Sequence, residues 1–144
     1  MWAALGALTL CACGGLPSTA HRTLDGADTM TLVKLDPTPG DAPGERLYGY
    51  LVLGKAEVVD AAERAQIVSI LDATAGKGTP AKCFNPRHAV LATKGSDRVE
   101  LVICYECAQI HVHHGLADHE MITTSPDGTE LGRRFAAHGL AGAR

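Results

Sequence analysis

The chain has 144 residues, of which 46% are hydrophobic and 20% are charged, values that fit one globular domain with a single core. This composition excludes a largely disordered chain. The net charge is −3 and Lys and Arg form no cluster, which excludes the basic surface of a nucleic-acid-binding protein. We therefore expect no nucleic-acid partner.

The first residues have the character of an export signal. Residues 1–12 are uncharged and apolar, and the run is too short to span a bilayer as a helix. Its end, Leu10-Cys11-Ala12-Cys13, resembles the lipobox of bacterial lipoproteins. The resemblance implies cleavage before Cys13 and attachment of lipid, including palmitate, to this residue. No Lys or Arg precedes the run, so we expect the true start codon to lie upstream of Met1.

The same resemblance predicts a location. Gly14 follows Cys13 where an Asp would retain a lipoprotein at the inner membrane, so the sorting rule implies the outer membrane, facing the periplasm. Several acyl chains anchor a protein stably, whereas one chain binds only marginally. We expect a protein of the bacterial cell envelope whose membrane partner is reached through a lipid anchor, while the sequence identifies no protein partner.

The chain after the signal begins with a small, polar segment. Residues 13–28 are expected to form a flexible tether, followed by one domain over residues 29–144. The β-branched run 29–35 predicts a strand, and the prolines and glycines of residues 36–44 predict a loop. A second strand is expected over residues 47–59, bent at Gly54.

Two helices are predicted. Asp60 and Glu63 have capping-box spacing ahead of Ile67, Ile70 and Leu71, which predicts a helix that ends at Gly76. A second helix is expected to begin with Ser125 as N-cap and Pro126 in its first position, to bury Leu131 and Phe135, and to end at Gly139 with Leu140 packed back on Phe135.

A hairpin is expected between the helices. Residues 89–93 and 99–112 predict two strands joined by a turn over residues 94–97, and the second strand is long. The order strand, strand, helix, hairpin, helix predicts an α+β fold, with a small, mostly antiparallel sheet and two helices packed on one face.

Three cysteines remain after removal of the signal and lipidation of Cys13. A three-residue turn would place Cys83 opposite Cys107, and a two-residue turn would place it beside Cys107, so these two are the best disulfide candidates. A bridge between Cys83 and Cys104 would require a curled chain near Pro86. A bridge between Cys104 and Cys107 would require a tight turn, which the apolar pattern of the predicted strand opposes.

Metal and thiol chemistry are the alternatives. The spacings of a structural zinc site are approached by a Cys3His set, Cys83, His88, Cys104 and Cys107. Zinc would be the cofactor of such a site, whereas a disulfide requires no cofactor. Exported thiols tend to be oxidised before they hold metal. A thiol-dependent enzyme is the third hypothesis, although a redox CxxC normally opens a helix and this one is predicted within a strand.

The histidines after the CxxC form a separate candidate site. On a strand, His111 and His113 point to one face, and His119, with Glu120 or Asp118, could complete a zinc or copper site. The competing interpretation is a solvated strand end.

One resemblance covers most of the domain. The segments "CFNPRHAV", "LVICYECAQIHV" and "ITTSPDG", with the end "FAAHGL", lie within residues 47–140. Together they resemble a family of small, uncharacterised bacterial exported proteins and lipoproteins. The family implies no activity, and its pattern does not include the histidines at 111, 113 and 114. It implies that one structural unit contains Cys83, Phe84, Pro86, His88, Cys104 and Cys107.

The sequence thus predicts a lipid-anchored envelope domain that binds or interacts and is not an enzyme. A metal-binding envelope module and a thiol-dependent enzyme are the alternatives.

Overall fold

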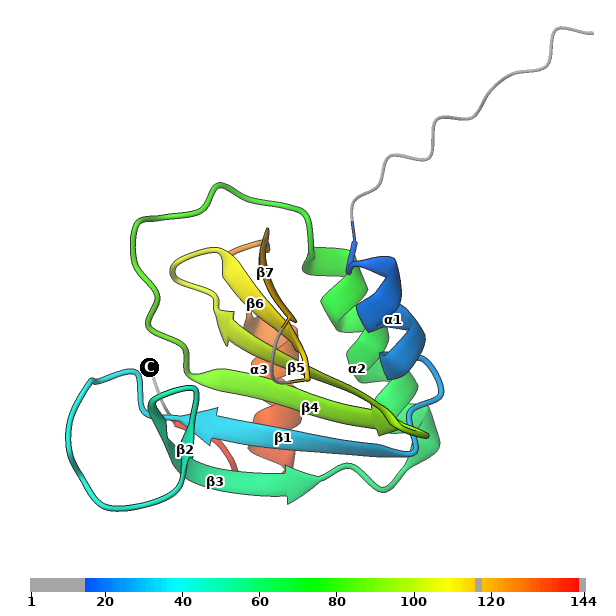
Figure 1. Ribbon diagram of the computed structural model, residues 1–144, viewed down its shortest axis with the longest axis horizontal. Helices are drawn as coiled ribbons and strands as arrows, with labels where there is room; N and C mark the ends of the chain where they lie inside the picture. Colours follow the sequence, from blue (N-terminus) through cyan, green and yellow to red (C-terminus); the bar gives the residue numbers. More distant parts are fainter. Residues whose placement is uncertain (1–14, 116–117, 143–144) are drawn as a thin grey trace, which may run out of the picture.

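A computed structural model of the protein describes residues 15–115 and 118–142. These residues form an α+β fold built on one seven-stranded sheet of order β2-β3-β1-β4-β5-β6-β7, in which each neighbouring pair is antiparallel (Figure 1). The helices of the described residues are α1 (Ser18–Leu24), α2 (Ala61–Thr74) and α3 (Thr129–Ala137). The strands are β1 (Thr29–Leu35), β2 (Arg46–Leu47), β3 (Tyr50–Glu57), β4 (His88–Lys94), β5 (Asp97–Cys104), β6 (Gln109–His114) and β7 (Asp118–Thr123).

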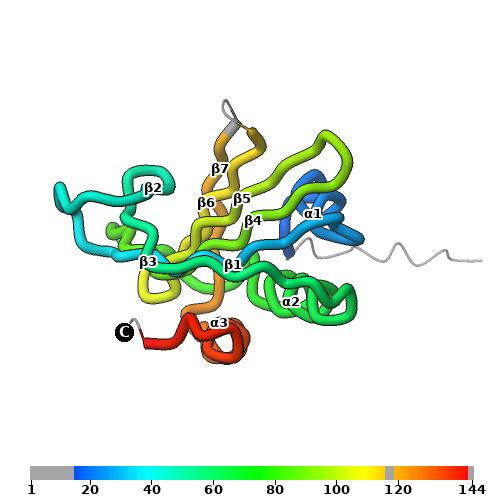
Figure 2. The backbone as a smooth tube through the Cα atoms, turned by 90° about the horizontal axis from the view of Figure 1, so that it is seen from below, coloured from blue at the N-terminus to red at the C-terminus, as the bar shows by residue number. Residues whose placement is uncertain are grey.

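The two sides of the sheet have different neighbours. One set of alternating strand residues, including Met30, Val90 and Leu101, forms the main core with buried residues of all three helices. The opposite set forms a smaller cluster around Val33 and Val102. We call this second side the open face. Figure 2 shows the sheet curling there, with β2 at one end and β6 and β7 at the other rising away from α2 and α3.

Several local predictions are confirmed. The Asp60 carboxylate caps α2 by accepting hydrogen bonds from the backbone N–H groups of Ala62 (2.7 Å) and Glu63 (3.0 Å). β4 and β5 pair with Lys94 opposite Asp97, so their turn is the two-residue form. Leu131 and Phe135 are buried, and the N–H of Leu140 donates to the Phe135 carbonyl (2.9 Å).

The predicted tether over residues 13–28 is wrong for residues 16–27. Ser18–Leu24 is helical, and Ala20 and Leu24 are buried in the main core. The backbone N–H of Leu16 donates to Asp72 on α2, at 3.2 Å. Polar composition suggested a tether, but three apolar residues, spaced four apart from Leu16, bury one face of the helix. The described residues therefore hold three helices, where two were predicted.

Two predicted strands are each interrupted by a tight turn. The expected strand 47–59 is a hairpin, because Tyr48 and Gly49 both adopt positive φ (49° and 89°) between β2 and β3. The expected strand 99–112 is also two strands, β5 and β6, which pair with Cys104 opposite Gln109. The last helix begins later than predicted, with Gly128 rather than Ser125 at its N-cap.

Candidate functional site

The turn between β5 and β6 carries the CxxC motif. Residues 105–108 form this turn, in which the N–H of Ala108 donates to the Tyr105 carbonyl (3.0 Å) and Ala108 has a φ of 52°. The turn brings the Cα atoms of Cys104 and Cys107 to 5.3 Å, within the range of a disulfide. The prediction that this pair lies apart on a strand is therefore wrong.

The loop from residue 76 to residue 87 brings the third cysteine to the same place. Figure 1 shows this loop passing from the end of α2 along the β6 end of the sheet to the start of β4. The Cα atoms of Cys83 and Cys107 are 5.7 Å apart, so the predicted pair is within disulfide range. Cys83 does not lie on β4, and the loop, not strand pairing, brings it to Cys107. Cys107 therefore contacts both other cysteines.

Hydrogen bonds hold the loop against the turn. The N–H of Ala81 donates to the Cys107 carbonyl (3.0 Å), and the Gln109 side chain donates to the carbonyls of Ala81 (2.5 Å) and Cys83 (3.1 Å). The Arg87 guanidinium also pairs with Glu106 in the turn, at 3.0 Å. These contacts place the loop without a covalent bond.

His88 lies away from the cysteines. It shares its side of β4 with Val90 of the main core, and its ring packs edge-to-face on Phe135 of α3, with centroids 4.7 Å apart. Cys104 instead shares its side of β5 with Val102, on the open face. Burial, with the positive charges of Arg87 and Lys34 adding to it, lowers the pKa of His88 to about 4. The predicted Cys3His set is thus not brought together.

Three other histidines do come together, on the open face. His111 and His113 alternate along β6, and His119 lies opposite His113 on β7. The ring of His119 lies 5.0 Å from His111 and 4.7 Å from His113, measured between centroids. Met121, opposite His111, is 49% exposed on the same face. The expectation that His111 and His113 point to one face is confirmed, whereas His119, expected in a loop, lies on β7.

Aromatic rings cover both ends of this group. Phe84 stacks on His111 and Tyr48 stacks on His113, each with ring centroids 3.6 Å apart. Phe84 comes from the loop that carries Cys83, and Tyr48 comes from the turn between β2 and β3. We call these rings the aromatic–histidine row: Phe84, His111, His119, His113 and Tyr48.

Burial and neighbouring charges favour the neutral forms of His111, His113 and Tyr48. Burial, with the neighbouring imidazoles of His119 and His113 adding to it, lowers the pKa of His111 to about 4. Burial and His119 also lower the pKa of His113. Burial raises the pKa of the Tyr48 hydroxyl, and the Glu100 carboxylate beside it adds to the rise. Glu100 is itself buried and paired with Arg98.

Most neighbouring rings of the row are stacked, although the rings of His111 and His119 are tilted by 60° to each other. His113 and His119 are inclined by only 26°. Among residues 15–115 and 118–142, no group of three or more His, Cys, Asp or Glu is arranged to hold a metal ion. In the same part of the chain, no helix is long and apolar enough to cross a membrane. Cys13 lies outside the described residues.

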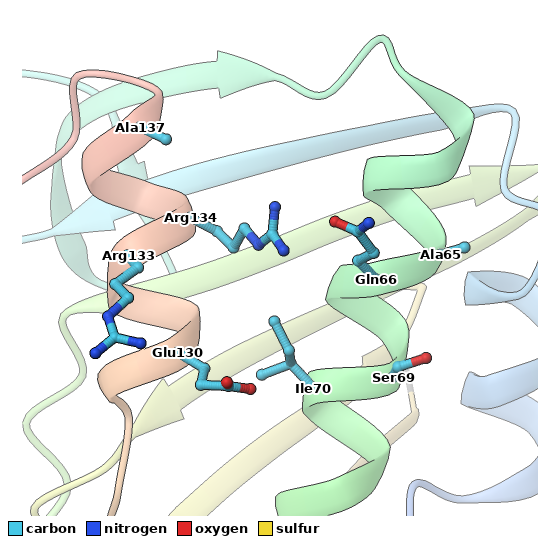
Figure 3. A pocket seen from close by; sticks show the side chains of 8 residues that line it. All are labelled: Ala65, Gln66, Ser69, Ile70, Glu130, Arg133, Arg134 and Ala137. Atoms are coloured by element: carbon cyan, nitrogen blue, oxygen red, sulfur yellow. The ribbon is translucent and has the colours of Figure 1, made fainter.

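A groove of about 540 Å³ lies between α2 and α3, away from the cysteines and the row. Figure 3 shows Arg134 of α3 and Gln66 of α2 reaching toward each other across it, with Glu130 beside Ile70. Its lining residues include no cysteine or histidine. The groove therefore offers neither a thiol nor an imidazole.

Sequence reasoning missed four contributors to the open face: Tyr48, Phe84 as a ring partner, Gln109 and Met121. The Tyr-Gly pair at residues 48–49 is a turn signal that could have located Tyr48. The others depend on pairing across strands and on the path of the loop, for which no local signal exists.

Comparisons with protein-family models, with curated proteins and with solved structures each find no match.

Proposed function

We propose that the protein is a lipid-anchored binding domain of the bacterial cell envelope, with its helices packed on one face of the sheet and its ligand bound on the open face. The observation that carries the proposal is the aromatic–histidine row. Rings from a hairpin turn, a long loop and two strands gather there, with Tyr48 43% exposed and Met121 49% exposed. Exposed aromatic and methionine side chains are typical of surfaces that bind protein partners.

The backbone at Tyr48 supports this use of the face. A bulky residue at positive φ is rare, and such outliers cluster at functional sites. Here the stack on His113 and the contact with Glu100 fix the ring over the sheet. A rigid aromatic side chain loses little conformational entropy when it binds.

Site-specific photocrosslinking in the envelope tests the binding face. A benzoylphenylalanine residue at position 121 should crosslink an envelope protein, because Met121 lies beside the row. Position 59 is the matched control, since Val59 is an exposed apolar residue (77%) in the β3–α2 connection. Equal crosslinking at both positions, or none at 121, contradicts the proposal.

The lipid anchor has its own test. Cys13→Ser should abolish incorporation of labelled palmitate and release the protein from the membrane fraction, whereas Cys11→Ser, two positions earlier, should change neither. Only Gly14 and Gly15 separate Cys13 from Leu16, which packs on the main core. Membrane retention of the Cys13→Ser protein would refute lipidation at this residue.

A second candidate function is binding of a transition metal, zinc or copper. It is favoured by the gathering of His111, His113 and His119, since neutral imidazoles are good ligands for both metals. The thioether of Met121 on the same face would favour copper in its reduced state. Binding requires the stacked rings to rotate toward one ion.

Calorimetric titration with zinc and copper salts tests this candidate. One equivalent should bind to the full chain and be lost in His113→Ala. His138→Ala is the control, because His138 lies beyond α3, where it pairs with Glu63 at 2.9 Å. Equal loss of binding in both variants, or none in either, would reject the histidine site.

A further inference from the structure

The sulfur of Cys107 is shared between two neighbours. Both Cys83 and Cys104 lie within disulfide range of it, with Cα separations of 5.7 Å and 5.3 Å. One sulfur forms only one disulfide, so whichever bridge exists leaves the other cysteine as a thiol beside it. This arrangement permits thiol–disulfide exchange within the chain.

The three cysteines differ in exposure. Cys104, at the end of β5, and Cys107, in the turn that follows, are buried, at 1% and 0% exposure. Cys83 is partly exposed, on a loop whose residues 76–82 are exposed. A small molecule in solution therefore meets Cys83 first, and the other two sulfurs lie behind it.

Contacts other than a disulfide anchor the loop that carries Cys83. Its anchors are backbone and side-chain hydrogen bonds, chiefly from Ala81 to the Cys107 carbonyl and from Gln109 to the Cys83 carbonyl. The stack of Phe84 on His111 adds to them. Since none of these contacts needs a disulfide, breaking the bridge leaves the sulfurs within reach of one another.

The turn also favours the thiolate, which is the attacking form, of Cys104. The backbone N–H of Cys107 donates to Sγ of Cys104, at 3.2 Å. A donor aimed at sulfur stabilises the thiolate, which is the nucleophile in exchange.

We infer that the three cysteines form a thiol–disulfide relay that reduces a low-molecular-weight disulfide. The Cys83 thiolate attacks the substrate disulfide, forms a mixed disulfide and expels one substrate thiol. The Cys107 thiolate then attacks Cys83 and expels the second. Finally the Cys104 thiolate attacks Cys107, and the Cys83 sulfur leaves with the electron pair and takes a proton. Overall, the substrate disulfide gains two electrons and two protons, and the thiols of Cys104 and Cys107 become a disulfide.

A single-turnover experiment with glutathione disulfide tests the relay. The full chain with Cys11→Ser and Cys13→Ser is reduced, mixed with one equivalent of the probe, quenched with acid and alkylated at timed intervals for peptide mapping. A Cys83–glutathione adduct should appear first and decay. The product should have a Cys104–Cys107 bridge, a free Cys83 and two released glutathiones.

Three further substitutions, each in that background, should stop the relay at different points. Cys107→Ser should retain the glutathione adduct on Cys83, and Cys104→Ser should accumulate the Cys83–Cys107 bridge. Cys83→Ala should slow glutathione release by about an order of magnitude or more, because only buried thiols remain. Its urea midpoint, compared with that of the parent, shows whether it is folded.

Two outcomes overturn the inference. One is a folded Cys83→Ala protein that reduces the probe as fast as the parent, which would mean that entry does not require Cys83. The other is a Cys107→Ser protein that resolves its adduct by a Cys83–Cys104 bridge, which would remove Cys107 from the pathway.

Discussion

The largely buried imidazole of His88 should make the stability of the protein depend on pH. Its pKa is lowered from 6.5 to about 4 in the folded state by burial between β4 and α3. Below pH 6.5 the unfolded chain therefore binds a proton that the folded protein excludes, so stability is lost as the pH falls toward 4. A pKa shift of this size changes the free energy of unfolding by about 3 kcal/mol over the whole titration. About 2 kcal/mol of this is lost between pH 7.5 and pH 5.

Urea denaturation of the native protein and of His88→Gln, each at pH 7.5 and pH 5, measures this loss. The glutamine variant should be less stable at pH 7.5, because it loses ring packing on Phe135. Between pH 7.5 and pH 5, the free energy of unfolding of this variant should fall by about 2 kcal/mol less than that of the native protein. The lowered pKa of His111 makes the same contribution to the pH dependence of both proteins, so it cancels in the comparison. An equal pH-dependent loss in the two proteins would refute the assignment of the burial effect to His88.

Three further predictions concern stability. Gly128→Ala should lower the free energy of unfolding by about 1–3 kcal/mol in urea denaturation, because its Cβ would overlap the Tyr105 ring. Gly132→Ala on α3, which has open space around it, should instead raise that free energy by about 0.5–1 kcal/mol. The opposite order of stability would contradict the packing described. Asp60→Ala should cost about 1 kcal/mol through loss of the α2 cap, and an unchanged urea midpoint would show that the cap is not used. The oxidised Cys104→Ser protein should be more stable than its reduced form by about 3 kcal/mol, since a Cys83–Cys107 bridge spans a separation of 24 residues. Equal urea midpoints for the oxidised and reduced forms would exclude this bridge.

The elements with strong local signals were predictable from the sequence. The cap at Asp60 and the apolar period after it located α2, and the β-branched run located β1. The two-residue turn at Gly95-Ser96 was one of two forms that the hairpin pattern allowed. These features depend on residues close together in the chain, so local propensity determines them.

The failures came where tertiary packing overrides propensity. Residues 18–24 are polar enough for a tether, yet Ala20 and Leu24 find an apolar surface on the main core. The run from Val99 to Val112 reads as one strand because its apolar residues continue through the turn at residues 105–108. There, hydrogen bonds from the loop around Ala81 stabilise the turn.

The candidate site was predictable only in part. Strand alternation was enough to place His111 and His113 on one face, and Cys83 was correctly expected near Cys107. The shared position of Cys107 depends on a tight turn and a distant loop meeting on the open face. No sequence spacing contains that information, since the loop is held by the Gln109 side chain and by backbone contacts.

Differential alkylation of the protein isolated from the envelope, with peptide mapping of each cysteine, tests the sharing of Cys107 most directly. Each oxidised molecule should have one bridge and one free thiol among Cys83, Cys104 and Cys107. The label should be divided between Cys83 and Cys104 and absent from Cys107. Label on Cys107 together with a Cys83–Cys104 bridge would contradict the arrangement of the three cysteines.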